Sequence, residues 1–160
     1  MTDNSNLAQH PEPPKFAADL MLGRLARWLR LMGADVIWGG ELHGHALVEE
    51  ARRDQRVILT RDKRLRTAPD ALFIESNYFR EQIRQVLGRF PFDPRACAFT
   101  RCSECNQPLI EVSRELVRRR VPPFVYASHE TFAECEQCGR VYWGATHLER
   151  ALRELESLGL

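Results

Sequence analysis

The stretch Lys15–Gly33, with the sequence KFAADLMLGRLARWLRLMG, decides the fold class because its hydrophobic pattern changes at Asp19. Phe16-Ala17-Ala18 is a short apolar run and predicts a buried strand. Beyond Asp19, apolar residues recur at helical spacing until Gly33 ends the predicted helix. These residues are Leu22, Leu25, Ala26, Leu29 and Met32. A strand followed at once by an amphipathic helix is typical of the first half of a β-α-β unit.

Short strands and helices continue to alternate after Gly33. Strands are predicted at Val36–Trp38, Arg56–Thr60 and Ala71–Ile74, and helices at Ala46–Arg53 and Tyr78–Gly88, the second capped by Asn77. This alternation indicates right-handed β-α-β units and a parallel sheet with helices on both faces. The sequence therefore predicts an α/β fold.

Pro91-Phe92-Asp93-Pro94 interrupts the alternation and marks a predicted boundary. The expected parts are a disordered tail at 1–14, an α/β domain at 15–94, a cysteine-containing segment at 95–145 and a C-terminal helix at 146–160. Thr146 and Glu149 form a capping box at the start of that helix. An oligomer or protein partner could cover its apolar stripe, which comprises Leu148, Ala151, Leu152, Leu155 and Leu158.

The composition limits the classes of function. The chain has 160 residues, of which 44% are hydrophobic, and carries 23 Lys and Arg against 22 Asp and Glu. This allows a packed core and excludes a generally basic nucleic-acid coat. No run approaches the roughly 18 apolar residues of a membrane span, and the polar N-terminus lacks the features of a signal peptide. With an odd number of cysteines, these features favour a cytoplasmic protein with reduced thiols.

Four of the five cysteines form two C-x-x-C pairs, Cys102/Cys105 and Cys135/Cys138. Each pair presents two thiolates on one side of a turn, and two such turns complete a tetrahedral shell of four sulfurs around Zn²⁺. A closed shell leaves no position for water, so the predicted zinc ribbon is structural. Cys97 stands outside the pattern. Between the pairs, Arg118-Arg119-Arg120 either contacts phosphates or is a solvated helix end.

Two acids lie at the ends of predicted strands, Asp19 directly after Phe16–Ala18 and Asp62 one residue beyond Arg56–Thr60. Function in an open parallel sheet collects beyond the carboxyl ends of the strands, so neighbouring strands would bring both carboxylates into one crevice. Such a pair suits Mg²⁺ or Mn²⁺, which take oxygen ligands and recruit phosphate oxygens. Metal-assisted phosphodiester hydrolysis is the implied reaction. The alternative is a helix cap at Asp19 and an ordinary turn acid at Asp62.

Other candidate residues admit two interpretations. Arg24, Arg27 and Arg30 recur every three residues beside Trp28, either along a nucleic-acid backbone or on the solvent face of the helix. His43 and His45 could chelate a softer metal or be ordinary loop residues. The chain has no G-x-G-x-x-G motif and no Walker A loop, which disfavours nucleotide cofactors.

A family resemblance rests on six segments in order along the chain: Phe16–Arg30, Ile58–Asp62, Arg101–Asn106, Arg120–Pro122, Cys135–Trp143 and Thr146–His147. Over roughly 15–148 they resemble the Mut-seven C-terminal RNase domain family. The resemblance implies a PIN-like three-layer α/β fold with a fused zinc ribbon. It also implies a Mg²⁺- or Mn²⁺-dependent ribonuclease acting on RNA, with Asp19 and Asp62 as metal ligands.

PIN-like domains usually carry a further aspartate before the second helix, where this chain has Gly44 or His45. Glu41 before the helix, or Glu49 or Glu50 within it, could substitute, and Glu41 and Glu49 are the expected catalytic residues. The position of a further acid in the family pattern falls near Asn77, whose neutral amide oxygen is the one ligand atom it could offer a metal. Arg24, Arg27 and Arg61 are the expected contacts to single-stranded RNA. The alternative function is a catalytically degenerate module that binds RNA or protein.

Overall fold

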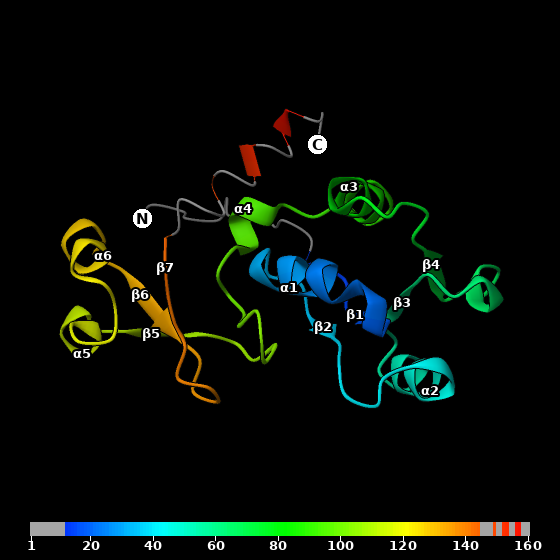
Figure 1. Ribbon diagram of the computed structural model, residues 1–160, viewed down its shortest axis with the longest axis horizontal. Coiled ribbons are helices and arrows are strands. Elements are labelled where there is room, and N and C mark those ends of the chain that lie inside the picture. The colour runs from blue at the N-terminus through cyan, green and yellow to red at the C-terminus, as the bar shows by residue number, and fades with distance from the viewer. Residues whose placement is uncertain (1–11, 145–148, 150–151, 154–155, 158–160) are drawn as a thin grey trace, which may run out of the picture.

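The computed structural model describes residues 12–144 together with 149, 152, 153, 156 and 157. Most of the expected N-terminal tail, and most of the C-terminal helix predicted at 146–160, lie outside these residues. Two parts lie side by side along the long axis of the molecule, an α/β part and a smaller all-antiparallel β part with two short helices (Figure 1). Within the described residues, no helix is both long enough and apolar enough to cross a membrane.

The α/β part is built on a four-stranded sheet in the order β2-β1-β3-β4. The strands are β1 (Phe16–Ala18), β2 (Val36–Ile37), β3 (Val57–Thr60) and β4 (Ala71–Phe73). All three neighbouring pairs are parallel. The prediction of a parallel α/β sheet is therefore confirmed. The chain leaves β1 towards β2 on one side and then crosses to β3 on the other, so the strand order reverses next to β1.

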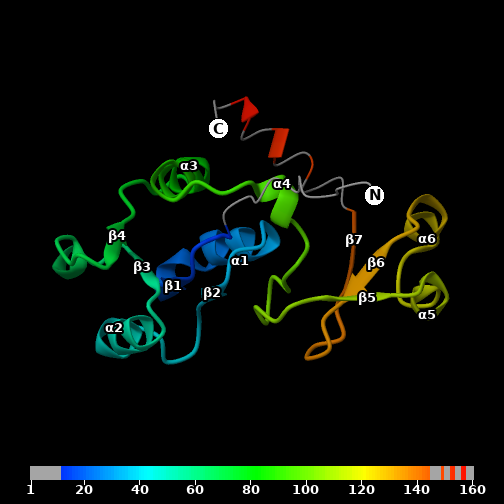
Figure 2. The same cartoon turned by 180° about the vertical axis from the view of Figure 1, so that it is seen from behind.

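Helices cover both faces of this sheet (Figure 2). They are η1 (Leu20–Leu22), α1 (Gly23–Leu31), α2 (Gly44–Arg53), η2 (Lys63–Leu65), α3 (Phe79–Arg89) and α4 (Pro94–Cys97). Side chains alternate along β1, where Phe16 and Ala18 pack with α1 and α3, and Ala17 packs with Leu47 and Ala51 of α2. Period-two alternation thus divides the core into two clusters and produces three layers. Leu152 of the C-terminal segment is buried in the cluster of Phe16.

The beginning of α3 differs from the prediction. Asn77 does not cap the helix, because α3 begins at Phe79 and Tyr78 occupies the N-cap position. The Ser76 hydroxyl accepts a hydrogen bond from the Tyr78 N–H at 3.0 Å. A serine two residues before the tyrosine thus orders this turn, which sequence alone cannot distinguish from capping by the adjacent asparagine.

The end of α1 requires glycine. Gly33 has φ 95°, and its N–H bonds the carbonyl of Arg30 at 2.9 Å. A Cβ at this position would lie 2.2 Å from the backbone oxygen of Cys97. Gly33 therefore both stops the helix and lets the backbone at the end of α4 approach it closely.

The β part is an antiparallel sheet in the order β5-β6-β7. Its strands are β5 (Ile110–Val112), β6 (Phe132–Glu134) and β7 (Val141–Trp143). Two short helices, α5 (Arg114–Val117) and α6 (Pro123–Ser128), connect β5 to β6. They pack over a small core of Val117, Val121, Val125 and Phe132. The core is small for an independent unit, which is typical of domains held by a metal.

Candidate functional site

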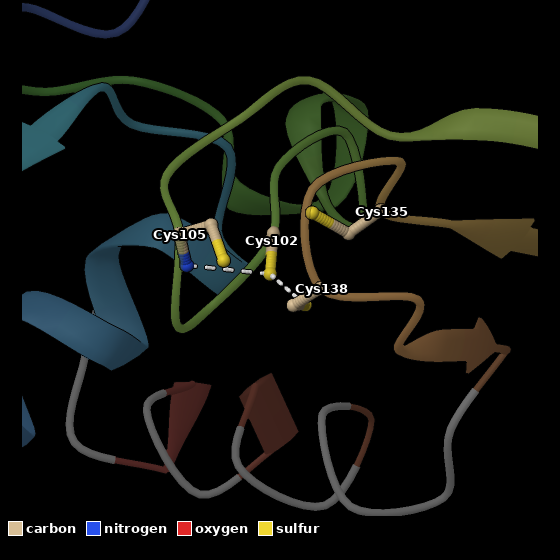
Figure 3. A group of neighbouring side chains, drawn as sticks. All are labelled: Cys102, Cys105, Cys135 and Cys138. Carbon is tan, nitrogen blue, oxygen red and sulfur yellow. Dashed lines mark hydrogen bonds between the residues drawn. The ribbon is translucent and has the colours of Figure 1, made fainter.

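The four paired cysteines come together in two facing turns (Figure 3). One turn precedes β5 and the other joins β6 to β7, and the four sulfur atoms all lie within 4.8 Å of one another. The Sγ atoms of Cys102 and Cys138 are 3.7 Å apart. A tetrahedral thiolate shell with Zn–S bonds of about 2.3 Å requires sulfur separations of about 3.8 Å. The donor set and its spacing therefore fit a structural zinc ion.

Without a cation, the crowded sulfurs oppose one another's ionisation. Burial and the neighbouring thiols of Cys138 and Cys102 raise the pKa of Cys105 to about 12. Burial also disfavours the thiolate of Cys102, but hydrogen bonds from the Tyr142 hydroxyl and nearby backbone N–H groups outweigh it and lower its pKa to about 7. The cluster can hold four thiolates only when a cation offsets their charge.

Arg30 fixes the first cysteine turn to helix α1. Arg30 is only 3% exposed. The interpretation that the repeated arginines of this helix lie on its solvent face is therefore wrong for Arg30. Its Nη1 donates to the carbonyls of Ser103 and Glu104 at 3.0 and 2.7 Å, and its Nε donates to the carbonyl of Val36 at 2.8 Å. One buried guanidinium therefore joins α1, β2 and the cysteine turn.

Asp35 and Asn106 form a second link between the two parts. Asn106 donates from Nδ2 to Asp35 Oδ1 at 2.7 Å, and its Oδ1 accepts the Val36 N–H at 3.0 Å. Arg56 donates from Nη1 to the same carboxylate at 2.7 Å. Burial raises the pKa of Asp35, but the bonds from Arg56 and Asn106 outweigh it and hold that pKa below its usual value. The ionised Asp35 carboxylate thus accepts hydrogen bonds from both the α/β part and the cysteine turn.

The second candidate site lies where the strand order reverses. Asp19 directly follows β1, and Asp62 follows β3 after one intervening residue. β1 and β3 are parallel neighbours, so their carboxyl ends meet at one edge of the sheet. Ligands of open α/β sheets bind at this position. We call this region, defined by Asp19, Thr60 and Asp62, the carboxylate edge.

The buried Thr60 hydroxyl connects the two acids. It donates to Asp19 Oδ2 at 3.0 Å and accepts the Asp62 N–H at 2.9 Å. Each acid also caps a short helix, because Asp19 Oδ1 accepts the Leu20 N–H and Asp62 Oδ1 accepts the Arg64 N–H. The capping interpretation is therefore confirmed for Asp19. Capping does not exhaust the four or so lone-pair positions of a carboxylate, so a metal can share it.

Arg64 occupies the outer side of Asp62. Its Nη2 is 2.7 Å from Asp62 Oδ2, and its Nε lies 3.0 Å from both carboxylate oxygens. The side-chain and backbone hydrogen bonds from Arg64 lower the pKa of Asp62. Asp62 is accordingly ionised at neutral pH, as a metal ligand must be.

The two glutamates of the expected site lie elsewhere. Glu41 is fully exposed, with its Oε2 4.0 Å from His43 Nε2, and Glu49 is exposed, with its Oε2 3.5 Å from His45 Nδ1. Within the described part of the chain, the four cysteines are the one group of three or more His, Cys, Asp or Glu residues close enough to share an ion. The structure thus brings Asp19 and Asp62 to one edge and does not gather Glu41 or Glu49 with them.

The three arginines expected to contact RNA have different surroundings. Arg24 is exposed and its guanidinium lies 4.4 Å from the ring centre of Phe79. Arg27 is 3.3 Å from Glu104 of the cysteine turn. Arg61 donates to the carbonyls of Ile74 and Ser76 at 2.9 and 2.7 Å, so it holds the loop after β4.

Sequence reasoning missed the residues that assemble these sites. Thr60 bonds the Asp19 carboxylate and the Asp62 N–H, and Arg64 pairs with the Asp62 carboxylate. A threonine at the end of a strand directly before an acidic turn is a local signal that could have identified Thr60. Arg30 and Asp35 contact the cysteine turn across more than 70 residues, and no pattern in the sequence indicates such a contact.

These features define a doubly wound α/β domain fused to a four-cysteine ribbon that could hold zinc, with two aspartates at the switch point of its sheet. The model of the Mut7-C RNAse domain family matches residues 14–155. The chain belongs to this family, as its sequence resemblance predicted, and its function is accordingly nuclease-like. No curated protein matches the chain.

Proposed function

We propose that this protein is a ribonuclease that hydrolyses RNA phosphodiester bonds with Mg²⁺ or Mn²⁺ held by Asp19 and Asp62. The observation that carries the proposal is the Thr60 hydroxyl, which donates to the Asp19 carboxylate and accepts the Asp62 backbone N–H at the point where the strand order reverses. Membership in an RNase domain family supports the same function. A cytoplasmic setting suits the free thiols of the ribbon.

The donor set at the carboxylate edge fits a hard divalent cation. Mg²⁺ is commonly held by one or two carboxylates, with water and substrate phosphate oxygens completing the shell. Such a cation would make a bound water more acidic and would stabilise the leaving oxygen. Glu41 and Glu49 are proposed to complete the shell or to orient water once RNA and the cation are bound, because the structure as folded does not gather them with Asp19 and Asp62. Both side chains are exposed, and their ion-pair partners among the described residues are the exposed His43 and His45.

The protein's own residues prepare this edge. Thr60 orients Asp19 and fixes the Asp62 backbone, and Arg64 keeps Asp62 ionised. Arg24 lies on the first turn of α1, and the described residues offer it no acid, so its guanidinium is available to a phosphate. Preorganised charges of this kind stabilise negative charge that develops on phosphate oxygens.

Exposed apolar side chains beside the carboxylate edge favour single-stranded RNA. Leu20 and Met21 follow Asp19, and Tyr78, which is 78% exposed, lies after the carboxyl end of β4. Unpaired bases stack on aromatic rings such as that of Tyr78 and pack against apolar side chains such as Leu20 and Met21, whereas the bases of a duplex are covered by their neighbours. The substrate proposed for this edge is therefore RNA with unpaired bases.

The test is cleavage of end-labelled single-stranded RNA by purified protein in Mg²⁺ or Mn²⁺. Asp62→Asn should lower the rate by about 100-fold or more, because loss of a charged ligand removes several kcal/mol of stabilisation from a site with few carboxylates. Asp70→Asn is the matched control: Asp70 is also paired with an arginine, Arg52 at 2.6 Å, but precedes β4 at the opposite edge. Equal activity of the Asp62→Asn protein, or activity without any divalent metal, would refute the proposal.

A catalytically degenerate module that binds RNA is the second candidate. It is favoured by the separation of Glu41 and Glu49 from the two aspartates and by the guanidinium of Arg64 on Asp62. This function predicts salt-sensitive RNA binding and no cleavage in Mg²⁺ or Mn²⁺. Measuring both cleavage and binding of the same RNA by the same protein therefore distinguishes the ribonuclease from the RNA-binding module.

A further inference from the structure

The turn between the two short helices of the ribbon, α5 and α6, carries two arginines that the rest of the described protein does not contact. Among the arginines that the structure describes, Arg118 and Arg119 are the two whose guanidinium groups form no ion pair, hydrogen bond or ring contact. Both are exposed. The adjacent Arg120 differs, because it contacts Glu134 and donates to the Gly139 carbonyl at 2.6 Å.

Large apolar side chains accompany these free charges. Phe124 on α6 is 72% exposed, and Leu116 on α5 is 68% exposed. The valines of the same helices form the small ribbon core, which fixes α5 and α6 beside each other (Figure 1). Because these valines already fill the ribbon core, Leu116 and Phe124 are exposed without leaving the core unfilled. They form the outer surface of a packed pair of helices.

The charge of this segment is of one sign. From Leu116 to His129 the chain contains three arginines and no aspartate or glutamate. In a protein with 23 basic and 22 acidic residues, such a segment is locally basic although the whole chain is almost neutral. Exposed guanidinium groups and an exposed aromatic ring in one short segment match the backbone and the unpaired bases of a single strand.

We propose that Arg118, Arg119, Leu116 and Phe124 form a second RNA-binding surface, here called the ribbon surface, that holds single-stranded RNA outside the carboxylate edge. The two guanidinium groups contact phosphates, and Phe124 stacks on a base. The choice of RNA as the polyanion rests on the proposed ribonuclease function. The ribbon surface would thus add affinity for longer RNA without taking part in cleavage.

The experiment measures binding of a fluorescein-labelled single-stranded RNA by anisotropy, with the zinc-loaded 160-residue protein and no added Mg²⁺ or Mn²⁺. Arg118→Ala/Arg119→Ala should weaken binding about tenfold at low salt and make the log–log salt dependence shallower by about 1.4, since each phosphate contact on a single strand contributes about 0.7. Phe124→Ala should weaken binding about fivefold or more. All three side chains are exposed, so zinc content and the melting temperature should stay unchanged.

Arg52→Ala/Arg53→Ala is the matched control. It removes the same charge from an exposed helix, α2, but these two arginines are paired with Asp70 and Glu50. RNA affinity and salt dependence that change equally in both double variants would overturn the proposal, because net charge alone would then explain the loss. An unchanged affinity of the Arg118→Ala/Arg119→Ala protein would also overturn it, and loss of self-association in that variant would assign the surface to a second copy of the chain.

The assay is independent of catalysis. Binding without Mg²⁺ or Mn²⁺ reports on the ribbon surface whether or not the protein cleaves RNA. If the parent protein fails to cleave RNA, and its RNA affinity falls when Arg118 and Arg119 are replaced, the ribonuclease proposal is refuted and the ribbon surface is supported. Cleavage with no dependence of affinity on these arginines would do the reverse.

Discussion

The four-cysteine cluster and the carboxylate edge differ in what they need from a metal. The four sulfurs lie within 4.8 Å of one another, and without a cation burial and mutual contact raise the pKa values of Cys105 and Cys135. At the carboxylate edge, backbone N–H groups, the Thr60 hydroxyl and Arg64 already bond the two aspartates. The four thiols thus need a cation before they can ionise together, whereas the two aspartates are already held in place by hydrogen bonds from the protein.

This difference separates structural from chemical roles. A cluster that repels itself contributes to folding only when a cation binds, so the ion becomes part of the free energy of folding. A carboxylate edge that is internally bonded keeps its shape when the cation leaves. Removal of zinc should therefore act on structure, and removal of the Mg²⁺ or Mn²⁺ of the proposed ribonuclease on activity alone.

Loss of one cysteine ligand should have the largest effect. Cys135→Ser should abolish stoichiometric zinc binding and unfold the ribbon, since structural zinc contributes about 10 kcal/mol or more to small domains. Hydrogen exchange followed by mass spectrometry should show lost protection in β5, β6 and β7 and retained protection in β1 and β3, which have their own core. Metal analysis of the purified protein gives the stoichiometry.

Cys97→Ser is the control for this change, because Cys97 lies outside the cluster. It should bind zinc as the parent does. Addition and removal of Mg²⁺ or Mn²⁺ at fixed zinc should leave the melting temperature of the parent within about 2 °C, as expected for weak binding. A ribbon that keeps its exchange protection without zinc would contradict the distinction between the two sites.

The two sites also differ in how far the sequence predicts them. The C-x-x-C spacing encodes two local turns, so Cys102, Cys105, Cys135 and Cys138 are identified before any fold is known. Asp19 and Asp62 could be placed at one edge because short apolar strands indicate a parallel sheet. The separation of Glu41 and Glu49 from that edge depends on the path of the loop before α2, which has no periodic pattern.

Contacts between the parts were beyond sequence reasoning for a different reason. Arg30 occupies a helical position that periodicity assigns equally well to solvent, and only the position of the cysteine turn determines its burial. Periodicity describes one element at a time, whereas a buried charge is determined by its partners on other elements.

Breaking the Arg30 contact should have an intermediate effect. Arg30→Met keeps the length of the side chain but leaves the carbonyls of Val36, Ser103 and Glu104 without their buried donor. We expect a loss of about 3 kcal/mol in the free energy of unfolding, because unpaired buried polar groups cost about 1–3 kcal/mol each and the guanidinium also costs desolvation. Urea unfolding at pH 7 measures it.

Arg24→Met on the same helix is the matched control for Arg30→Met. Arg24 is exposed and contacts the Phe79 ring, so its loss should cost below about 1 kcal/mol. If the two variants were equally stable, the buried guanidinium would not be the link between α1 and the cysteine turn.

The smallest expected effect is the pH dependence that Asp35 gives to the same junction. Its side chain is 17% exposed, and bonds from Arg56 and Asn106 hold its pKa below the unfolded value of about 3.9. A carboxyl group with a lowered folded pKa stabilises the protein above the unfolded pKa, and this contribution is lost as the pH falls through the folded pKa. Asp35→Asn turns the amide N–H₂ towards the donors of Arg56 and Asn106 and should lower the free energy of unfolding by about 2 kcal/mol at pH 7.

The difference in unfolding free energy between the parent and Asp35→Asn should therefore be constant from pH 8 to about pH 5 and should narrow below about pH 4. Both chains lose zinc through the same protonation of thiols, so the difference between them isolates the carboxylate. Glu111→Gln, at an exposed position of β5 with no ion pair among the described residues, should show no such gap. If the difference in unfolding free energy instead widened below about pH 4, the Asp35 carboxyl would have a raised pKa in the folded protein. Its ionised form would then not stabilise the junction, and Arg30 would hold the junction without Asp35.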